Sequence, residues 1–191
     1  MGGTTFVAWR LDERKNAATW DSGEGARLYG GRWNSRGKRI VYCSIDPATA
    51  ILEVAVHKGF KALDTVPHVL TSAVITDPAS IHVVLPNAVP DSNWLRPGVP
   101  SAGQQAFGDS LSSAHAFVLI PSAVSTHSWN LIFDVHVATT LYSRQLQEDF
   151  ALDTRLHPPS VQMRPIKRSE RRRSSAGKQQ SASVVPPNQF L

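Results

Sequence analysis

Three short stretches in the first third of the chain decide how the rest of it is interpreted. Residues 30–34 read Gly-Gly-Arg-Trp-Asn, residues 41–44 read Val-Tyr-Cys-Ser, and residues 50–53 read Ala-Ile-Leu-Glu. The first stretch predicts a turn, the second a strand and the third part of a helix. One arginine, one tyrosine and one glutamate therefore stand on three successive elements of structure.

The helix that contains the third stretch has clear boundary signals. Asp46 suits the N-cap, because its carboxylate accepts backbone N–H groups, and Pro47 suits the first helical position. We expect the helix over residues 48–57, with Glu53 in its middle. Its apolar face is expected to consist of Ala50, Leu52, Val54 and Ala55.

Runs of β-branched and aromatic residues predict the strands of the remaining chain. Strands are expected over residues 5–10, 39–43, 69–75, 81–85, 116–120, 130–133 and 135–141. Residues 20–38 and 86–104 are rich in turn formers and are expected to be loops, with a short helix over 104–113. Several short strands with few helices predict a single α+β domain with a mixed or antiparallel sheet, not a doubly wound parallel sheet.

The carboxyl-terminal segment differs in composition from the rest of the chain. Residues 157–191 hold seven of the 20 Lys and Arg residues and one of the 15 Asp and Glu residues, a charge of +6. Residues 1–156 hold the other 13 basic and 14 acidic residues, a charge of −1. We therefore expect one domain over 1–157 and a basic, disordered tail over 158–191, which either binds acidic partners or nucleic acid weakly or is only solvated.

Several classes of protein and site are disfavoured by the composition. The single cysteine, Cys43, excludes an intrachain disulfide and a zinc site built from cysteines, and it favours a reducing compartment. The amino terminus lacks the apolar core of a signal peptide, and no apolar run approaches the roughly 18 residues that span a bilayer. The seven histidines show no metal-binding spacing. We expect a cytoplasmic protein with no metal site and no membrane contact.

Each candidate side chain has a functional and a structural interpretation. Arg32 follows two glycines, so its guanidinium either grips phosphate oxygens or braces the loop through backbone carbonyls. Tyr42 either stacks on a flat heteroaromatic group or is a core aromatic. Glu53 stands in an apolar run and is either a paired functional carboxylate or a residue of the solvent face. Ser122, after an apolar strand and a proline, either binds a ligand or caps a turn.

Taken together, these stretches resemble the RES domain family, the toxins of RES–Xre toxin–antitoxin systems, over about residues 6–156. The matching positions are Arg10, Gly25-Ala26-Arg27, the three stretches above, Gly37, Gly108, Ile120-Pro121-Ser122-Ala123, Asn130 and the closing residues 150–156. The arginine, glutamate and serine of the family's name correspond to Arg32, Glu53 and Ser122.

The resemblance implies an α+β core similar to that of ADP-ribosyltransferase toxins, with NAD+ as substrate and no cofactor. Members cleave NAD+ at the nicotinamide–ribose bond by hydrolysis or phosphorolysis, and their partner is an Xre-type antitoxin that covers the active site. On this basis we expect Arg32, helped by Arg10, to hold the diphosphate and Tyr42 to pack against the nicotinamide or its ribose. Glu53 is expected to stabilise the positive charge that develops on the ribose, and Ser122 to orient the nicotinamide end.

The chain departs from the family pattern at two places. Residues 134–137 read Asp-Val-His-Val, where the family usually has Asn-Pro and His-Pro. Shortly after Gly108 the family usually has an aromatic residue, and this chain has Ser110 and Leu111 there. Two alternatives stay open: a mono-ADP-ribosyltransferase that modifies a protein, and an inactive binding module that uses the basic tail. The nucleophile and the oligomeric state, including a homo-oligomer, also stay open.

Overall fold

The structure is a computed structural model, and it describes residues 5–156 of the 191-residue chain. The strands are β1 (Phe6–Glu13), β2 (Ile40–Ser44), β3 (His68–Ile75), β4 (Ile81–Val83), β5 (Phe117–Pro121), β6 (Trp129–Asp134) and β7 (Tyr142–Phe150). The α-helices are α1 (Glu24–Tyr29), α2 (Pro47–Lys58), α3 (Phe60–Thr65), α4 (Ala102–Ala114) and α5 (Val135–Ala138). Short 3-10 helices are η1 (Arg14–Thr19), η2 (Pro78–Ser80), η3 (Pro86–Ala88), η4 (Ser92–Leu95) and η5 (Thr154–Leu156). The predicted tail over 158–191 lies outside the described residues.

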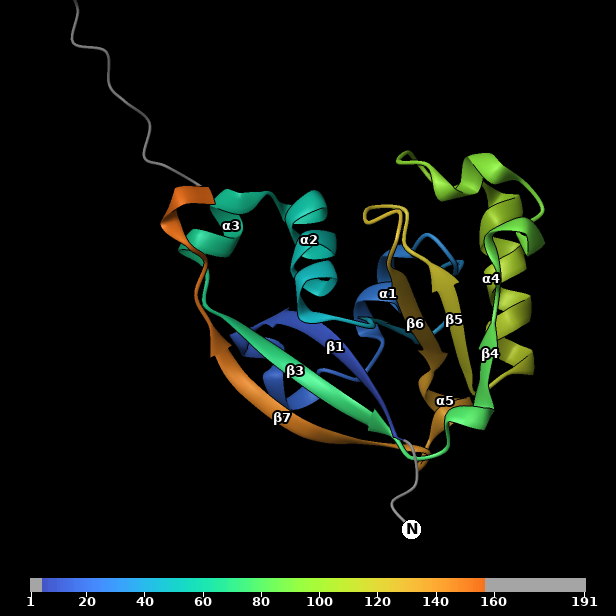
Figure 1. Ribbon diagram of the computed structural model, residues 1–191, viewed down its shortest axis with the longest axis horizontal. Coiled ribbons are helices and arrows are strands. Elements are labelled where there is room, and N and C mark those ends of the chain that lie inside the picture. Colours follow the sequence, from blue (N-terminus) through green and yellow to red (C-terminus); the bar gives the residue numbers. More distant parts are fainter. Residues whose placement is uncertain (1–4, 157–191) are drawn as a thin grey trace, which may run out of the picture. The chain divides into compact units, whose positions relative to one another are not determined.

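The seven strands form one mixed sheet in the order β4-β5-β6-β2-β1-β3-β7. All described neighbours are antiparallel except β4 and β5, which run parallel. The sheet is weakly joined in the middle, because β1 and β2 share a single register pair, Trp9 with Ser44. Figure 1 shows the two halves diverging from this point, with β1, β3 and β7 on one side and β4, β5 and β6 on the other. This arrangement confirms the predicted α+β class.

Alternate residues of β2 pack into two different cores, as the period of a strand requires. Val41 and Cys43 are buried in one cluster together with Phe117 and Phe133. Ile40 lies in a second cluster, which half-buried Tyr42 also contacts. Helix α4 contributes to that second cluster and contacts β5 and β6, on the right of Figure 1.

The predicted helix after β2 is confirmed as α2. Asp46 is its N-cap and accepts the Thr49 N–H at 2.8 Å, Pro47 begins the helix, and Gly59 ends it with a φ of 78°. One part of the prediction was wrong: Leu52 is 37% exposed and does not belong to the apolar face. The packed face consists of Ala50, Ile51, Val54 and Ala55.

The first predicted loop, residues 20–38, contains helix α1, which the sequence did not indicate. The helix is six residues long and has no buried residue, so it leaves no apolar periodicity in the sequence. Gly23 precedes it with a φ of 62°, and Gly30 follows it with a φ of 73°. The carboxylate of its first residue, Glu24, accepts a hydrogen bond from Arg27 and forms an ion pair with Arg39. These contacts hold α1 against the start of β2.

The prediction of a strand over residues 135–141 was wrong. Strand β6 ends at Asp134, whose carboxylate accepts the His136 N–H at 2.8 Å and caps the short helix α5. A capping carboxylate at this point starts a helical turn in spite of the β-branched residues that follow. The next strand is β7, which is not predictable from the sequence because most of its residues are exposed and polar. Its pairing with β3 is also interrupted by a bulge opposite Ser72 and Ala73.

Candidate functional site

Glu53 lies in the middle of α2, contacts residues at the end of β5 and the start of β6, and is half-buried. Its Oε1 accepts a hydrogen bond from Asn130 Nδ2 at 2.6 Å and one from Ser122 Oγ at 2.9 Å. Its Oε2 accepts no hydrogen bond from any residue between 5 and 156. The carboxylate is therefore held through Oε1, and Oε2 is left without a donor among the described residues.

Ser122 lies immediately after β5, and its hydroxyl is fully used. It donates to Glu53 and accepts the backbone N–H groups of Val124 at 3.1 Å and Ser125 at 2.9 Å. The serine thus caps a turn, as one of its two interpretations predicted, and at the same time fixes the glutamate. Hydroxyl donation to a carboxylate is a charge-assisted hydrogen bond, which is stronger than a neutral one.

The turn capped by Ser122 is also tied to the start of α2. Ser128 Oγ donates to Asp46 at 2.8 Å and accepts from Thr49 Oγ1 at 2.8 Å. Burial would raise the pKa of Asp46, but the hydrogen bonds from Thr49 and Ser128 outweigh it and lower that pKa. The helix that carries Glu53 and the turn that carries Ser122 are therefore joined at two places.

Arg32 braces a loop in this structure. Its guanidinium donates to the carbonyls of Trp94 and Arg96, both at 3.2 Å, and of Gly98 at 3.3 Å. This geometry matches the structural interpretation of the residue. These contacts use three of the five N–H groups of the guanidinium, so the Nε–H and one Nη2–H receive no acceptor from the described residues and suit the phosphate-binding interpretation.

Tyr42 holds the Gly-Gly-Arg-Trp-Asn turn through its hydroxyl group. Its hydroxyl donates to Asn34 Oδ1 at 2.7 Å and accepts the Trp33 N–H at 3.0 Å. Burial raises the pKa of the phenol, so it stays protonated as a donor. Gly31 permits this approach, because a Cβ there would lie 2.6 Å from the Tyr42 hydroxyl oxygen.

Arg10 crosses the weak junction of the sheet. Its Nε and Nη2 donate to the Asp12 carboxylate at 2.7 Å each, and its Nη1 donates to the Tyr42 carbonyl at 2.8 Å. Burial would lower the pKa of Arg10, but the adjacent Asp12 carboxylate outweighs it and raises that pKa. The side chain thus joins β1 to β2 where the two strands share one register pair.

The five predicted site residues form two groups, and hydrogen bonds join the residues within each group. Glu53 contacts Ser122 directly, whereas Tyr42 contacts Arg10 and the turn that carries Arg32. Asn130, which matches the family pattern, is a direct partner of Glu53, a contact that was not predicted. The sequence carried no signal for this contact, because it depends on the register that sets β6 opposite β2.

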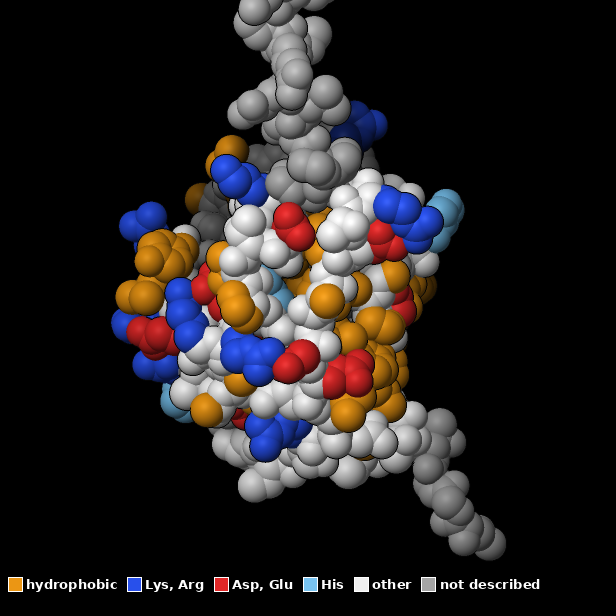
Figure 2. Space-filling model, turned by 90° about the vertical axis from the view of Figure 1, so that its left-hand side faces the viewer, with side chains coloured by type: hydrophobic (Ala, Val, Ile, Leu, Met, Phe, Trp, Pro, Cys, Tyr) orange, Lys and Arg blue, Asp and Glu red, His pale blue; other side chains and the backbone are white. Residues whose placement is uncertain are grey.

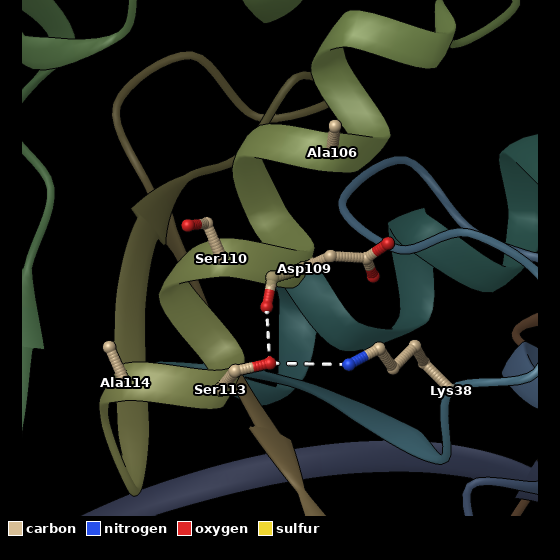
Figure 3. A pocket seen from close by; sticks show the side chains of 6 residues that line it. All are labelled: Lys38, Ala106, Asp109, Ser110, Ser113 and Ala114. Atoms are coloured by element: carbon tan, nitrogen blue, oxygen red, sulfur yellow. Dashed lines mark hydrogen bonds between the residues drawn. The ribbon is translucent and has the colours of Figure 1, made fainter.

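A separate surface depression of about 520 Å³ lies against α4 and includes none of these residues. It is lined by Lys38, Ala106, Asp109, Ser110, Ser113 and Ala114. In Figure 3, Ser113 Oγ accepts a hydrogen bond from Lys38 Nζ at 3.2 Å and donates one to the Asp109 carbonyl at 2.8 Å. Methyl groups and serine hydroxyls of this kind are typical of an exposed helix face.

Within residues 5–156, no cluster of three or more His, Cys, Asp and Glu side chains has the geometry to hold a metal ion. The same part of the chain contains no helix that is long and apolar enough to cross a membrane.

Comparisons with known proteins give the family. The chain is 30% identical over 166 residues to "Toxin Res" of Photorhabdus laumondii, with 79% of this chain and 97% of that protein covered. It is 32% identical over 137 residues to "Prs ADP-ribosylating toxin" of Sphingobium, with 68% of this chain and 83% of that protein covered.

Among solved structures, the Mycobacterium tuberculosis MbcT–MbcA toxin–antitoxin complex contains a chain of the same fold. The TM-score is 0.63 at 21% identity, with 78% of this chain and 86% of that chain covered. The sequence model of the RES domain matches residues 7–154, which include both groups of site residues. The chain therefore belongs to the RES domain family.

Proposed function

We propose that this chain is the toxin of a toxin–antitoxin system and that it cleaves NAD+ at the bond between nicotinamide and ribose. The observation that carries the proposal is the Glu53 carboxylate, held on Oε1 by Asn130 and Ser122 while Oε2 receives no hydrogen bond from the described residues. Family membership and the name of the Sphingobium relative, an ADP-ribosylating toxin, support NAD+ as the substrate.

The chemistry needs a fixed negative charge beside the ribose. Nicotinamide leaves as a neutral molecule with the electron pair of the C–N bond, and positive charge develops on the ribose ring. A carboxylate whose position is set in advance stabilises that charge without reorganising during the reaction. Water or inorganic phosphate then bonds to the ribose carbon and gives up a proton, and Glu53 Oε2 orients this nucleophile or a ribose hydroxyl.

The remaining predicted residues support the ligand in this proposal. Arg32 binds the diphosphate with the two N–H groups, on Nε and Nη2, that the carbonyls of residues 94–98 leave unused. Arg10 supports the turn that carries Arg32, because it holds Tyr42 through that residue's carbonyl oxygen. Tyr42 presents its ring to the nicotinamide end while its hydroxyl holds the turn. Ser122 acts through Glu53, to which it donates.

The test is nicotinamide release from NAD+, followed by proton NMR with and without phosphate, using protein freed of any antitoxin. Glu53→Gln keeps the size of the side chain and removes its charge, so we expect a loss of about 10²–10³-fold in kcat. Glu148→Gln is the matched control, because Glu148 is an exposed glutamate on β7. If the folded Glu53→Gln variant turned over NAD+ as fast as the wild type, the proposed role of Glu53 would be wrong. Nicotinamide release that depends on phosphate would identify phosphate as the nucleophile.

A second candidate is transfer of ADP-ribose to a protein. The name of the Sphingobium relative, whose match covers 68% of this chain, favours it. The same carboxylate would stabilise the same charge, and a protein side chain would replace water or phosphate. Radiolabel that moves from NAD+ onto a protein, with nicotinamide released in equal amount, would support transfer. Release that is complete without any labelled protein would support hydrolysis or phosphorolysis.

We also propose an Xre-type antitoxin as the partner, acting in the cytoplasm and covering the site. The solved complex of the same fold is a toxin–antitoxin complex, which supports a partner of this kind. The expected result is that the protein encoded beside this chain abolishes nicotinamide release at equimolar concentration. Full activity in the presence of a demonstrably bound partner would contradict a position over the site.

The alternative of an inactive module that binds nucleic acid rests on the predicted tail. Figure 2 shows acidic and basic side chains intermixed over the face it displays. Such a face lacks the one-sign patch that nucleic-acid binding uses. This alternative predicts salt-sensitive binding to nucleic acid that is lost when residues 158–191 are deleted, with NAD+ left intact.

A further inference from the structure

The contact between Glu53 and Asn130 continues to a buried serine. Asn130 Nδ2 donates to Glu53 at 2.6 Å, and on the other side of the same amide Asn130 Oδ1 accepts from Ser44 Oγ at 2.8 Å. Ser44 is 2% exposed and Asn130 is 7% exposed, so solvent does not supply a substitute partner readily. We propose that Ser44 is a positioning residue, which acts through Asn130 to fix the carboxylate of Glu53 for the proposed reaction.

The amide of Asn130 needs a partner on both of its ends to be held in place. The amide group of an asparagine rotates easily about the Cβ–Cγ bond, and a buried amide oxygen that has lost its donor turns toward another donor. The Ser44 hydroxyl occupies that oxygen and leaves the NH2 group directed at Glu53. Donation to the amide oxygen also polarises the amide and strengthens its N–H donation to the carboxylate.

The backbone of Ser44 is fixed from both sides, which suits a positioning role. Ser44 is the last residue of β2, and its register partners are Asn130 in β6 and Trp9 in β1. It also lies two residues before Asp46, the N-cap of the helix that carries Glu53. The chain therefore closes a ring of contacts that runs from β2 through α2 and Glu53 to Asn130 and back to Ser44. A reactive side chain held within such a ring keeps its geometry.

Three variants separate this role from general stability. Ser44→Ala removes the donor, Ser44→Thr keeps the hydroxyl, and Ser112→Ala is the matched control. Ser112 is also 2% exposed and donates at 2.5 Å to a backbone carbonyl, that of Gly108, but it lies in α4 and contacts neither Glu53 nor Asn130. The two alanine substitutions each remove one oxygen, whereas Ser44→Thr adds one methyl group at a buried position. Urea denaturation of each variant measures the effect on the fold.

The first measurement does not depend on activity. The side-chain amide of Asn130 is followed by proton–nitrogen NMR, and its exchange with solvent is compared among the variants. We expect exchange about tenfold faster in Ser44→Ala than in the wild type, no change in Ser112→Ala, and restored protection in Ser44→Thr. Equal protection of the Asn130 amide in Ser44→Ala and Ser112→Ala would overturn the proposal.

The second measurement follows nicotinamide release and rests on the proposed function. We expect Ser44→Ala to lower kcat by about 5- to 10-fold, the factor typical of one lost hydrogen bond, with KM changed less than twofold. Ser44→Thr should recover most of this loss. A change confined to KM, or equal kcat in Ser44→Ala and the wild type, would overturn the positioning role. A wild type that leaves NAD+ intact, while the Asn130 amide still loses protection in Ser44→Ala, would instead overturn the proposed function and support the contact.

Discussion

At Gly108, α4 lies so close to the Gly-Gly-Arg-Trp-Asn turn that one added methyl group should separate the two. A Cβ at Gly108 would lie 2.1 Å from the carbonyl oxygen of Trp33 and 2.6 Å from its carbonyl carbon. Both atoms are backbone, and Trp33 is only 1% exposed, so a side-chain rotation cannot relieve the clash. The Gly108→Ala variant must therefore move α4 by roughly 1 Å away from the core.

The magnitude follows from two opposed effects. Overpacking of backbone against backbone at this site should cost about 3 kcal/mol. Replacing glycine with alanine in a helix has the opposite effect and raises the free energy of unfolding by up to about 1 kcal/mol. Gly103→Ala on the same helix is the matched control, because its added Cβ would lie 3.5 Å from the Trp94 side chain, an ordinary contact. We expect Gly108→Ala to be less stable than Gly103→Ala by about 2–3 kcal/mol.

Urea denaturation monitored by tryptophan fluorescence measures the difference. With a slope of about 2 kcal/mol per molar urea, the two midpoints should differ by about 1–1.5 M. The wild-type midpoint should lie between them or close to that of Gly103→Ala. Midpoints that agree within about 0.3 M would refute the close approach of α4 to Trp33.

Three further predictions concern buried or paired groups. Tyr42→Phe deprives Asn34 and the Trp33 N–H of a partner, so the free energy of unfolding should fall by about 2–3 kcal/mol, and an unchanged urea midpoint would contradict this. Hydrogen bonds from Lys15 and Lys58 lower the pKa of Glu13 to about 2, from its ordinary value of 4.5. Because the pKa is lower in the folded state, the ionised carboxylate stabilises the fold fully above pH 4.5, and this stability is lost as the pH falls toward 2. Glu13→Gln should remove about 1 kcal/mol of that acid-dependent stability, and unchanged acid unfolding would show that the pairs contribute nothing. Burial raises the pKa of the Cys43 thiol to about 12, so iodoacetamide at pH 8 should label the unfolded chain and not the native protein.

The local structure around the site was predictable from the sequence because it depends on neighbours in the chain. Asp46 and Pro47 mark the start of α2 through the capping chemistry of the first turn, and both occupy the predicted positions. The run of β-branched and aromatic residues in β2 is likewise a local signal. Helix α1 and strand β7 were missed for the converse reason, since neither has an apolar period that reveals its packed face.

The pairing of distant residues could not be predicted in the same way. Ser44 and Asn130 are 86 residues apart in the chain, and only the register of β2 against β6 makes them partners. The contacts of Arg32 with the carbonyls of residues 94–98 depend on where a loop of many turn formers settles, which composition does not specify.

The sequence by itself determined the candidate site residues and the family to which the chain belongs, because motif residues and their spacing are properties of the chain. Only the tertiary structure decided how those side chains are used. It engaged one oxygen of Glu53 with Ser122 and Asn130, and it engaged Arg32 and Tyr42 in holding loops. The physical reason is that a hydrogen bond requires donor and acceptor within about 3 Å, and that distance is set by sheet register and helix packing.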